Sequence, residues 1–459
     1  MKKGLQYLVF ALIGVLICEG IIRKVLPGGL STVFILVKDG LAFLIMLLVL
    51  QNPPKGRAGL VLAAWAGLAV VMLPMILFTA IKDPILAVFG AKQYLLFPAV
   101  ALGMVAAFGQ TSPLEATRPY RYMAWALYPI VALSLLQLAL PPSHWLNLSV
   151  AGEDLSAFSA GGRLRVSGPF PFVAQYSWFL HVAIYAIALT LMVRPALEKP
   201  WSWLSHPLPL LFLLMIANFI SGSRLSAIGS ALIVVVGICF VLLRGKGKSL
   251  REIVVICAMA GLALLAARMV APAAFEAFDV RSGDLLEGEV GEEYMDRMNH
   301  AFFGWIYLYE HYQPGFFGYG LGVMSNGVQN ISAHAAQVRS QVWGEADLAN
   351  TVLEGGYYLV AIWMSFRLFI IAVCIRAFFS LQHSRVVLAG ALALGSVIFN
   401  GLFSTLGIQP PLAIWWFLSV GTLLLLENLE PYWRAVAAEK KKAGETAEPQ
   451  RDTLSGTSV

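Results

Sequence analysis

Apolar segments of about 20 residues recur along most of the chain, and this feature limits the possible fold more than any other. A helix rises about 1.5 Å per residue, so a segment of this length crosses about 30 Å of hydrocarbon. The strands of membrane barrels are shorter and alternate in polarity. We therefore expect an all-α polytopic integral membrane protein, in keeping with a chain that is 59% hydrophobic and 13% charged. Twelve membrane helices are predicted, at residues 5–22, 31–50, 58–80, 85–108, 121–140, 172–193, 207–221, 225–243, 252–270, 347–375, 386–404 and 411–427.

Basic residues are concentrated in alternate short connectors between these segments. They are Lys2, Lys3, Lys55, Arg57, Arg118, Arg121, Arg194, Lys199, Arg244, Lys246, Lys248, Arg251, Arg376, Arg385 and Lys440 to Lys442. All of them fall on one side of the membrane if both termini are cytoplasmic. The net charge of +6 is then explained by orientation, and no nucleic-acid partner is expected. The first segment has a basic start but no small-residue cleavage site, so we expect it to remain as a helix.

The predicted spans divide the chain into four regions. Helices one to nine occupy 1–270 and include a loop at about 141–171; a large loop occupies 271–346, helices ten to twelve occupy 347–430, and 431–459 is expected to be a disordered cytoplasmic tail. The four cysteines all lie inside predicted helices, so the sequence predicts neither a disulfide framework nor a metal site, and no cofactor.

The two long loops lie on the face opposite the basic connectors. Loops of this length are uncommon unless they are functional or disordered. Aromatic and aliphatic residues recur at helical spacing in MDRMNHAFFGWIYLYEHY (295–312), and the glycine-rich stretch PGFFGYGLG (314–322) ends that pattern. We predict that the large loop is partly helical and lies over the outer mouth of the bundle.

Three arginines near the outer face are not required by the orientation rule. Arg163 and Arg165 precede helix six, and Arg224 follows the short polar gap SGS between helices seven and eight. A guanidinium group presents a planar fork of donors that matches phosphate oxygens. The arginines therefore suit a pyrophosphate, or alternatively extend to lipid phosphates or pair with acids of the large loop.

Acidic residues open helix ten in GEADLANTVLEGG (344–356). Glu345 and Asp347 occupy its first turn, and Asn350 and Glu354 follow. Carboxylates in this position cap a helix and interact favourably with its dipole. The functional alternative is a general base at the mouth of the bundle.

Four motifs in order resemble the O-antigen ligase and polymerase family of bacterial envelope glycosyltransferases. They are RVSGPFPF, SGSRLSAIGSALIVV, DRMNHAFFGWIYLYEHYQPGFFGYGLG and EADLANTVLEGGYYLVAIW, and they span about residues 161–370. The resemblance implies an enzyme of the bacterial inner membrane whose active site faces the periplasm. Its donor would be an undecaprenyl-pyrophosphate-linked oligosaccharide, its acceptor a lipid-linked repeat or the lipid A core, and its surroundings membrane lipids and envelope polysaccharide assembly proteins. Arg165 and Arg224 match the arginines that hold the donor pyrophosphate, with Arg163 beside them.

The sequence departs from the family pattern at the start of helix ten. The usual pattern has a His-Asn pair with a glutamate nine residues after the histidine, and alignment on Glu354 places Glu345 at the histidine position. Either Glu345 or, from the loop, His334 is the expected base, with Asp347, Asn350 and Glu354 in support. The missing histidine favours a polymerase over a ligase.

Two other classes of protein are compatible with the composition. A carrier or flippase of lipid-linked oligosaccharides also has about twelve helices and intramembrane charges such as Lys38, Asp39, Lys92 and Arg367, but carriers often have repeated halves and this sequence shows no repeat. A scaffold protein would leave the arginines and Glu345 unexplained. The sequence therefore favours an inverting, metal-independent glycosyltransferase.

Overall fold

The computed structural model describes residues 2–150, 152, 165–198, 201–245, 247–283, 299, 303–344 and 346–447. Within these ranges the chain consists of helices and loops, without strands. The α-helices are α1 (Lys2–Val25), α2 (Gly28–Gln51), α3 (Gly56–Lys82), α4 (Pro84–Leu95), α5 (Pro98–Phe108), α6 (Pro113–Ala116), α7 (Arg118–Ala139), α8 (Val173–Val193), α9 (Trp201–Leu204), α10 (Pro207–Ile220), α11 (Arg224–Leu243), α12 (Gly247–Val270), α13 (Pro272–Gly283), α15 (Ala333–Arg339), α16 (Asp347–Ser380), α17 (Ser384–Phe403) and α18 (Pro410–Ala447). Short 3₁₀ helices lie at η1 (Trp145–Asn147), η3 (Arg194–Ala196) and η4 (Val328–Asn330).

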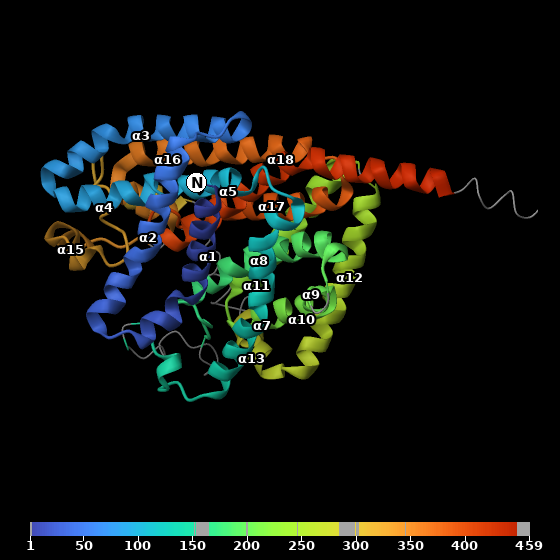
Figure 1. Cartoon of the computed structure of the whole chain (residues 1–459). Coiled ribbons are helices and arrows are strands. Elements are labelled where there is room, and N and C mark those ends of the chain that lie inside the picture. The colour runs from blue at the N-terminus through green and yellow to red at the C-terminus, as the bar shows by residue number, and fades with distance from the viewer. Residues whose placement is uncertain are drawn as a thin grey trace, which may run out of the picture.

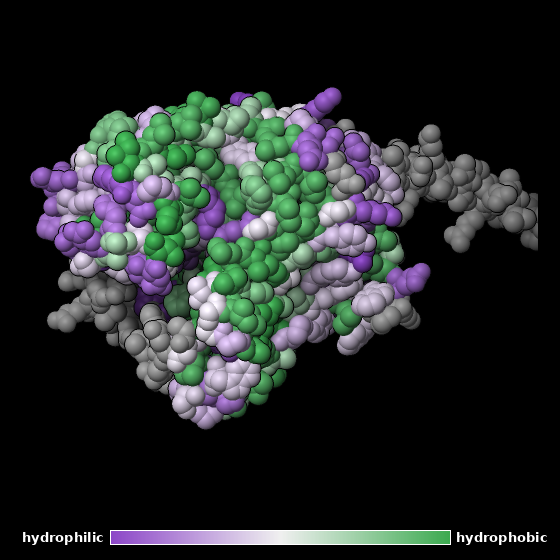
Figure 2. Space-filling model, turned by 60° about the vertical axis from the view of Figure 1, so that its left-hand side comes forward, coloured by the Kyte–Doolittle hydropathy of each residue, from purple (hydrophilic) through white to green (hydrophobic). Residues whose placement is uncertain are grey.

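Nine of the described helices are long and apolar enough to cross a membrane, and the bent pair α4 and α5 makes a tenth if it is one span. Two shorter apolar helices, α10 and the Cys257–Val270 part of α12, accompany them. Each predicted segment falls on one of these helices or on the bent pair. The space-filling view shows a broad hydrophobic area between hydrophilic residues on opposite sides, interrupted by a hollow with hydrophilic residues at its edge (Figure 2). The prediction of an all-α polytopic membrane protein is therefore confirmed.

The fourth predicted segment is bent where the sequence analysis expects one helix. α4 ends at Leu95, α5 begins at Pro98, and their axes differ by 45°. Pro98 has no N–H with which to continue the hydrogen bonds of α4, so the chain restarts a helix with proline in its first turn.

The connectors between the helices gather at two ends of the bundle. At the loop-bearing end, the Ile21 amide donates to the Pro169 carbonyl oxygen (3.0 Å), and Ser332 Oγ donates to Asp83 (2.6 Å). At the terminal end, Lys2 Nζ donates to the Gln110 carbonyl oxygen (3.1 Å). The described connectors 165–172, 221–223 and 314–344 thus share the first end, while the start of α1 lies at the second.

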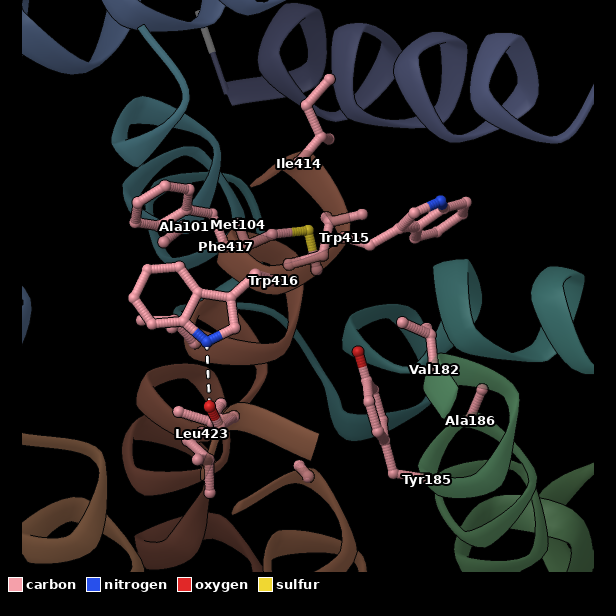
Figure 3. Packing of buried hydrophobic residues seen from close by; sticks show 14 of the residues in the cluster. Ala101, Met104, Val182, Tyr185, Ala186, Ile414, Trp415, Trp416, Phe417 and Leu423 are labelled. Carbon is pink, nitrogen blue, oxygen red and sulfur yellow. Dashed lines mark hydrogen bonds between the residues drawn. The ribbon is translucent and has the colours of Figure 1, made fainter. Parts of the chain in front are cut away.

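Large side chains from three separate segments fill the core. Figure 3 shows Trp415, Trp416 and Phe417 of α18 among residues of α5 and α8, including Met104 and Tyr185. The buried Trp416 indole N–H donates to the Val397 carbonyl oxygen (2.9 Å), as a buried indole requires. Figure 1 shows α18 continuing beyond this core to one side of the molecule.

Small residues allow α11 and α17 to approach closely. A methyl group on Gly395 would lie 2.3 Å from the Ile233 carbonyl oxygen, and one on Gly229 would lie 2.6 Å from Nε2 of the His181 ring. Close packing through small residues is the usual way in which membrane helices associate. It holds the start of α11, and therefore Arg224, against α8.

The large loop contains several short helices. α13 follows α12, residues 303–312 are helical, and η4 and α15 precede α16. The helical spacing in 295–312 predicted a helix, and residues 303–312, within the described part of that stretch, are helical. α18 continues through 431–447, which the sequence analysis assigns to a disordered tail; the alanine, glutamate and lysine residues there are good helix formers.

Candidate functional site

Arg165 and Arg224, 59 positions apart in the sequence, lie close together at the loop-bearing end. Arg165 stands at the start of the loop that leads into α8, and Arg224 is the first residue of α11. Burial lowers the pKa of Arg165, and the positive charge of Arg224 lowers that pKa further. The second turn of α8 also lies against the residue that precedes α11, because Ser177 Oγ is 3.4 Å from Ser223 Oγ. Two guanidinium groups therefore lie near one another at the N-terminus of α11, where anions are stabilised.

The turn before Arg224 is closed by its own polar groups. Gly222 has φ +58°, which glycine adopts at little cost. Ser221 Oγ donates to the Asn218 carbonyl oxygen (3.1 Å) and accepts from the Ser223 amide (3.2 Å). These bonds satisfy the turn, so an arginine at position 224 is not needed to form it.

The loop that carries Arg165 is fixed on both sides. Gln137 of α7 accepts from the Gly168 amide (2.9 Å) and donates to the Gly168 carbonyl oxygen (3.3 Å). A methyl group on Gly20 of α1 would lie 2.1 Å from the Phe170 carbonyl carbon, so only glycine allows this contact. Because its supports are α1 and α7, Arg165 is held on the helical scaffold.

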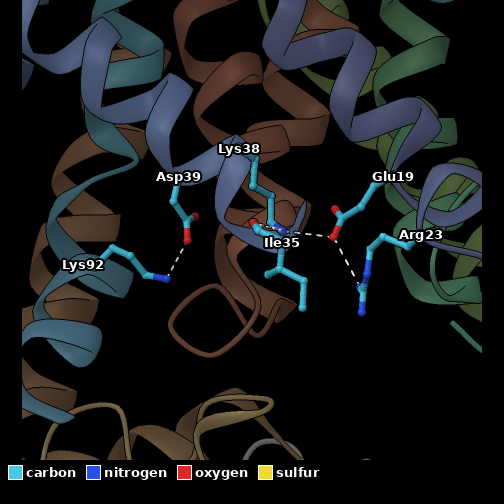
Figure 4. A network of polar contacts seen from close by, with 6 residues as sticks. All are labelled: Glu19, Arg23, Ile35, Lys38, Asp39 and Lys92. Carbon is cyan, nitrogen blue, oxygen red and sulfur yellow. Dashed lines mark hydrogen bonds and ion pairs between the residues drawn. The ribbon is translucent and has the colours of Figure 1, made fainter. Parts of the chain in front are cut away.

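An ionic network lies next to this contact, on α1, α2 and α4 (Figure 4). The buried Glu19 carboxylate pairs with Lys38 (3.0 Å) and, at 3.5 Å, with Arg23. Asp39 pairs with Lys92 (2.7 Å) on the other side of α2. Charges at membrane depth are expensive unless they are paired or functional. The pairs join α1, α2 and α4, and with three basic groups and two acids they leave the local charge positive.

His334 lies on α15, above the junction of α3 and α4. Its Nε2 is 2.9 Å from the Tyr319 carbonyl oxygen, to which Lys82 Nζ also donates at 3.4 Å. The carboxylate of Asp83 is near enough for the charge of His334 to lower its pKa. Because a carbonyl oxygen only accepts, Nε2 carries a hydrogen, and in the neutral ring the lone pair is then on Nδ1, which can accept a proton.

Lowering the pH is expected to loosen the large loop from the α3–α4 junction. Donation from the Ser332 hydroxyl and the Leu86 amide holds the pKa of Asp83 below its ordinary value. Because the folded-state pKa is the lower one, the Ser332 bond stabilises the docked loop above about pH 4, and the stabilisation is lost as the pH falls through the lowered pKa. Limited proteolysis of residues 314–344 between pH 7 and pH 3 measures this.

The control for that pH experiment is Ser332→Ala. Its loss of one hydrogen bond and of the cap on α15 is expected to cost about 1 kcal/mol or more at pH 7 and to flatten the dependence on pH. Identical pH curves for the variant and the unmodified protein would contradict the assignment.

Glu354 is fully buried at a break in α16. It accepts from Tyr94 Oη (2.6 Å) and from the Met324 amide (2.9 Å). Gly356 follows with φ +58°, and a methyl group there would lie 2.3 Å from the Phe316 carbonyl oxygen. Glu354 therefore joins α4, α16 and the glycine-rich part of the large loop, and its location supports a positioning role.

Asp347 and Asn350 are also buried, and neither side chain faces open solvent. Asp347 pairs with Arg367, which additionally donates to the carbonyl oxygens of Gly401 (2.6 Å) and Ser404 (3.2 Å). Asn350 Nδ2 donates to the Ala346 carbonyl oxygen (2.7 Å). The first turn of α16 is thus tied to the end of α17.

Two other predicted site residues, Glu345 and Arg163, lie outside the described residues.

The sequence analysis does not single out His181, which the structure places in the wall of this site. Its ring is fully buried in α8, with Nδ1 3.1 Å from Asn400 Oδ1 and Nε2 3.2 Å from the Leu225 carbonyl oxygen. His181 thus holds the residue that follows Arg224. An ionisable residue inside a predicted membrane segment is unusual, and this could have drawn attention to His181 in the sequence.

No protein-family model matches the chain, and no curated protein matches it.

Proposed function

We propose that this protein is a glycosyltransferase of the bacterial inner membrane that transfers an undecaprenyl-pyrophosphate-linked glycan to a sugar hydroxyl on the periplasmic face. The observation that carries the proposal is the proximity of Arg165, in the loop before α8, to Arg224, the first residue of α11. Nine long apolar helices, the bent pair and two shorter helices support a total of twelve spans. The basic terminal end supports cytoplasmic termini and a periplasmic loop-bearing end.

In the proposed reaction the acceptor oxygen attacks the anomeric carbon of the donor sugar. The bond from that carbon to the pyrophosphate oxygen breaks, undecaprenyl pyrophosphate leaves, and a base takes the hydroxyl proton. Arg165 and Arg224 stabilise the negative charge that develops on the leaving group. This single displacement inverts the configuration at the anomeric carbon.

Two groups remain candidates for the base. Glu345 is adjacent in sequence to the first turn of α16, where the resemblance places the catalytic histidine. His334 has the geometry of a base at Nδ1, because its Nε2 faces the Tyr319 carbonyl oxygen. Asp347, Asn350 and Glu354 support α16 from within the bundle.

The deciding experiment is incubation of the purified protein in lipid with a lipid-linked oligosaccharide and an acceptor. We expect release of undecaprenyl pyrophosphate together with a joined glycan. Transfer of the intact lipid-linked oligosaccharide between leaflets, without release, would instead identify a carrier. In cells that lack the protein, accumulated single repeats would indicate a polymerase, which we favour, and accumulated long lipid-linked chains a ligase.

A further inference from the structure

An apolar cavity of about 450 Å³ lies among α8, α10, α11, α12 and α17. Aliphatic side chains form most of its wall, and Asn218 and Ser230 are among its few polar lining residues. Val235 and Cys257, which also line it, are exposed at the surface of the bundle. The cavity therefore opens sideways, through helices that we place in the membrane.

The cavity follows the same face of α11 that begins with Arg224. Its lining residues Ala227, Ala231, Val234 and Ile238 come 3, 7, 10 and 14 positions after that arginine. These spacings place side chains along one stripe of a helix. At about 1.5 Å per residue the stripe is on the order of 20 Å long.

The polarity of the wall changes along that stripe. Asn218 Oδ1 accepts from Ser226 Oγ (3.0 Å) and from Ser230 Oγ (2.8 Å), so the polar groups lie in the half nearer Arg224. From Ala231 onward the α11 side of the wall is aliphatic or glycine. This order of charge, polar groups and hydrocarbon matches an amphiphile with an anionic head.

The volume limits what such an amphiphile can insert. At about 30 Å³ for a group the size of a water molecule, the cavity holds on the order of 15 carbon groups. That is about the size of one hydrocarbon chain or of three five-carbon isoprene units.

We propose that this cavity binds the isoprene units nearest the pyrophosphate of a polyprenyl pyrophosphate, while Arg224 and Arg165 bind the pyrophosphate itself. The proposal rests on the proposed function, because it extends the donor site from the head group into the membrane. By holding the hydrocarbon chain beneath the arginines, the cavity fixes the position of the donor relative to them.

Binding of farnesyl pyrophosphate, which has three isoprene units, and of inorganic pyrophosphate tests the proposal on the full chain in nanodiscs. Ala231→Phe fills the cavity from α11, and Ala260→Leu does so from α12. We expect either variant to weaken farnesyl pyrophosphate binding at least tenfold and to leave inorganic pyrophosphate binding unchanged. Leu232→Phe is the matched control, since Leu232 is exposed and does not line the cavity.

Three outcomes would overturn the assignment. The first is unchanged farnesyl pyrophosphate binding by both cavity variants when their thermal unfolding is normal. The second is an equal loss in Leu232→Phe. The third is displacement of farnesyl pyrophosphate by the same concentration of phosphatidylglycerol, which would make the cavity an ordinary lipid site.

Arg224→Ala distinguishes this failure from failure of the proposed function. It is expected to weaken both pyrophosphate ligands at least tenfold. If it weakens neither, the head-group site is wrong, whereas if only the cavity variants are without effect, the chain site alone is wrong.

Discussion

Replacing Arg224 with alanine is expected to lower the rate of glycan transfer by about 10²–10³-fold, the loss typical of removing one preorganised group that stabilises charge in a transition state. Arg224 begins α11, and Arg165 lies near enough for the charge of Arg224 to lower its pKa. The measurement is release of undecaprenyl pyrophosphate by purified protein in lipid, at equal protein amounts.

Two further substitutions separate the role of Arg224 from a general effect of removing charge. Arg224→Lys keeps the charge but loses the planar fork, so we expect an intermediate rate. Arg268→Ala removes an exposed arginine of α12 and is expected to leave the rate unchanged. Equal rates for Arg224→Ala and the unmodified protein would exclude the arginine from the reaction.

Replacing Arg367 with methionine is expected to lower the free energy of unfolding by about 3–5 kcal/mol, because the Asp347 carboxylate is then buried without its counter-charge. Arg367 is fully buried, and it also donates to two carbonyl oxygens beyond its pair with Asp347. Unfolding of the purified protein in detergent by a denaturant provides the measurement.

The double variant Asp347→Leu with Arg367→Met tests the cause of that loss. Removing both charges is expected to recover most of the stability, and the two unpaired carbonyl groups account for a remaining loss of about 1–3 kcal/mol. As a control, Arg268→Ala breaks a pair whose side chains are 61% and 46% exposed, and about 0–1 kcal/mol is expected. An equal loss in the single and double variants would show that the buried charge is not the cause.

The positions of the membrane helices were predictable from the sequence because hydrocarbon imposes a simple length requirement. The segment 225–243, for example, corresponds to α11 at Arg224–Leu243. The pairing of Arg165 with Arg224 was predicted from charges that the orientation rule does not explain, and the structure places the two near enough for the charge of Arg224 to lower the pKa of Arg165. Their chemical role remains a prediction.

Other features depend on tertiary contacts that no short pattern records. Pro98 was visible in the sequence, but proline occurs within continuous helices too, as Pro74 does in α3, so the bend between α4 and α5 was missed. The sequence placed Glu354 on a helix face, whereas its partner Tyr94 is 260 positions away. Such a contact follows from the packing of α4 against α16 and the large loop.

The break in α16 has a consequence for the order of assembly. The carbonyl oxygens of Leu353 and Glu354 accept from the amides of Tyr319 (2.9 Å) and Gly320 (3.1 Å). Inside a membrane an unbonded carbonyl is expensive, so α16 cannot settle at low energy until the preceding loop has arrived. Residues 319–320 leave the ribosome before residues 353–354, and synthesis therefore delivers the donors ahead of the acceptors. We therefore expect residues 319–320 and the first part of α16 to fold as one cooperative unit.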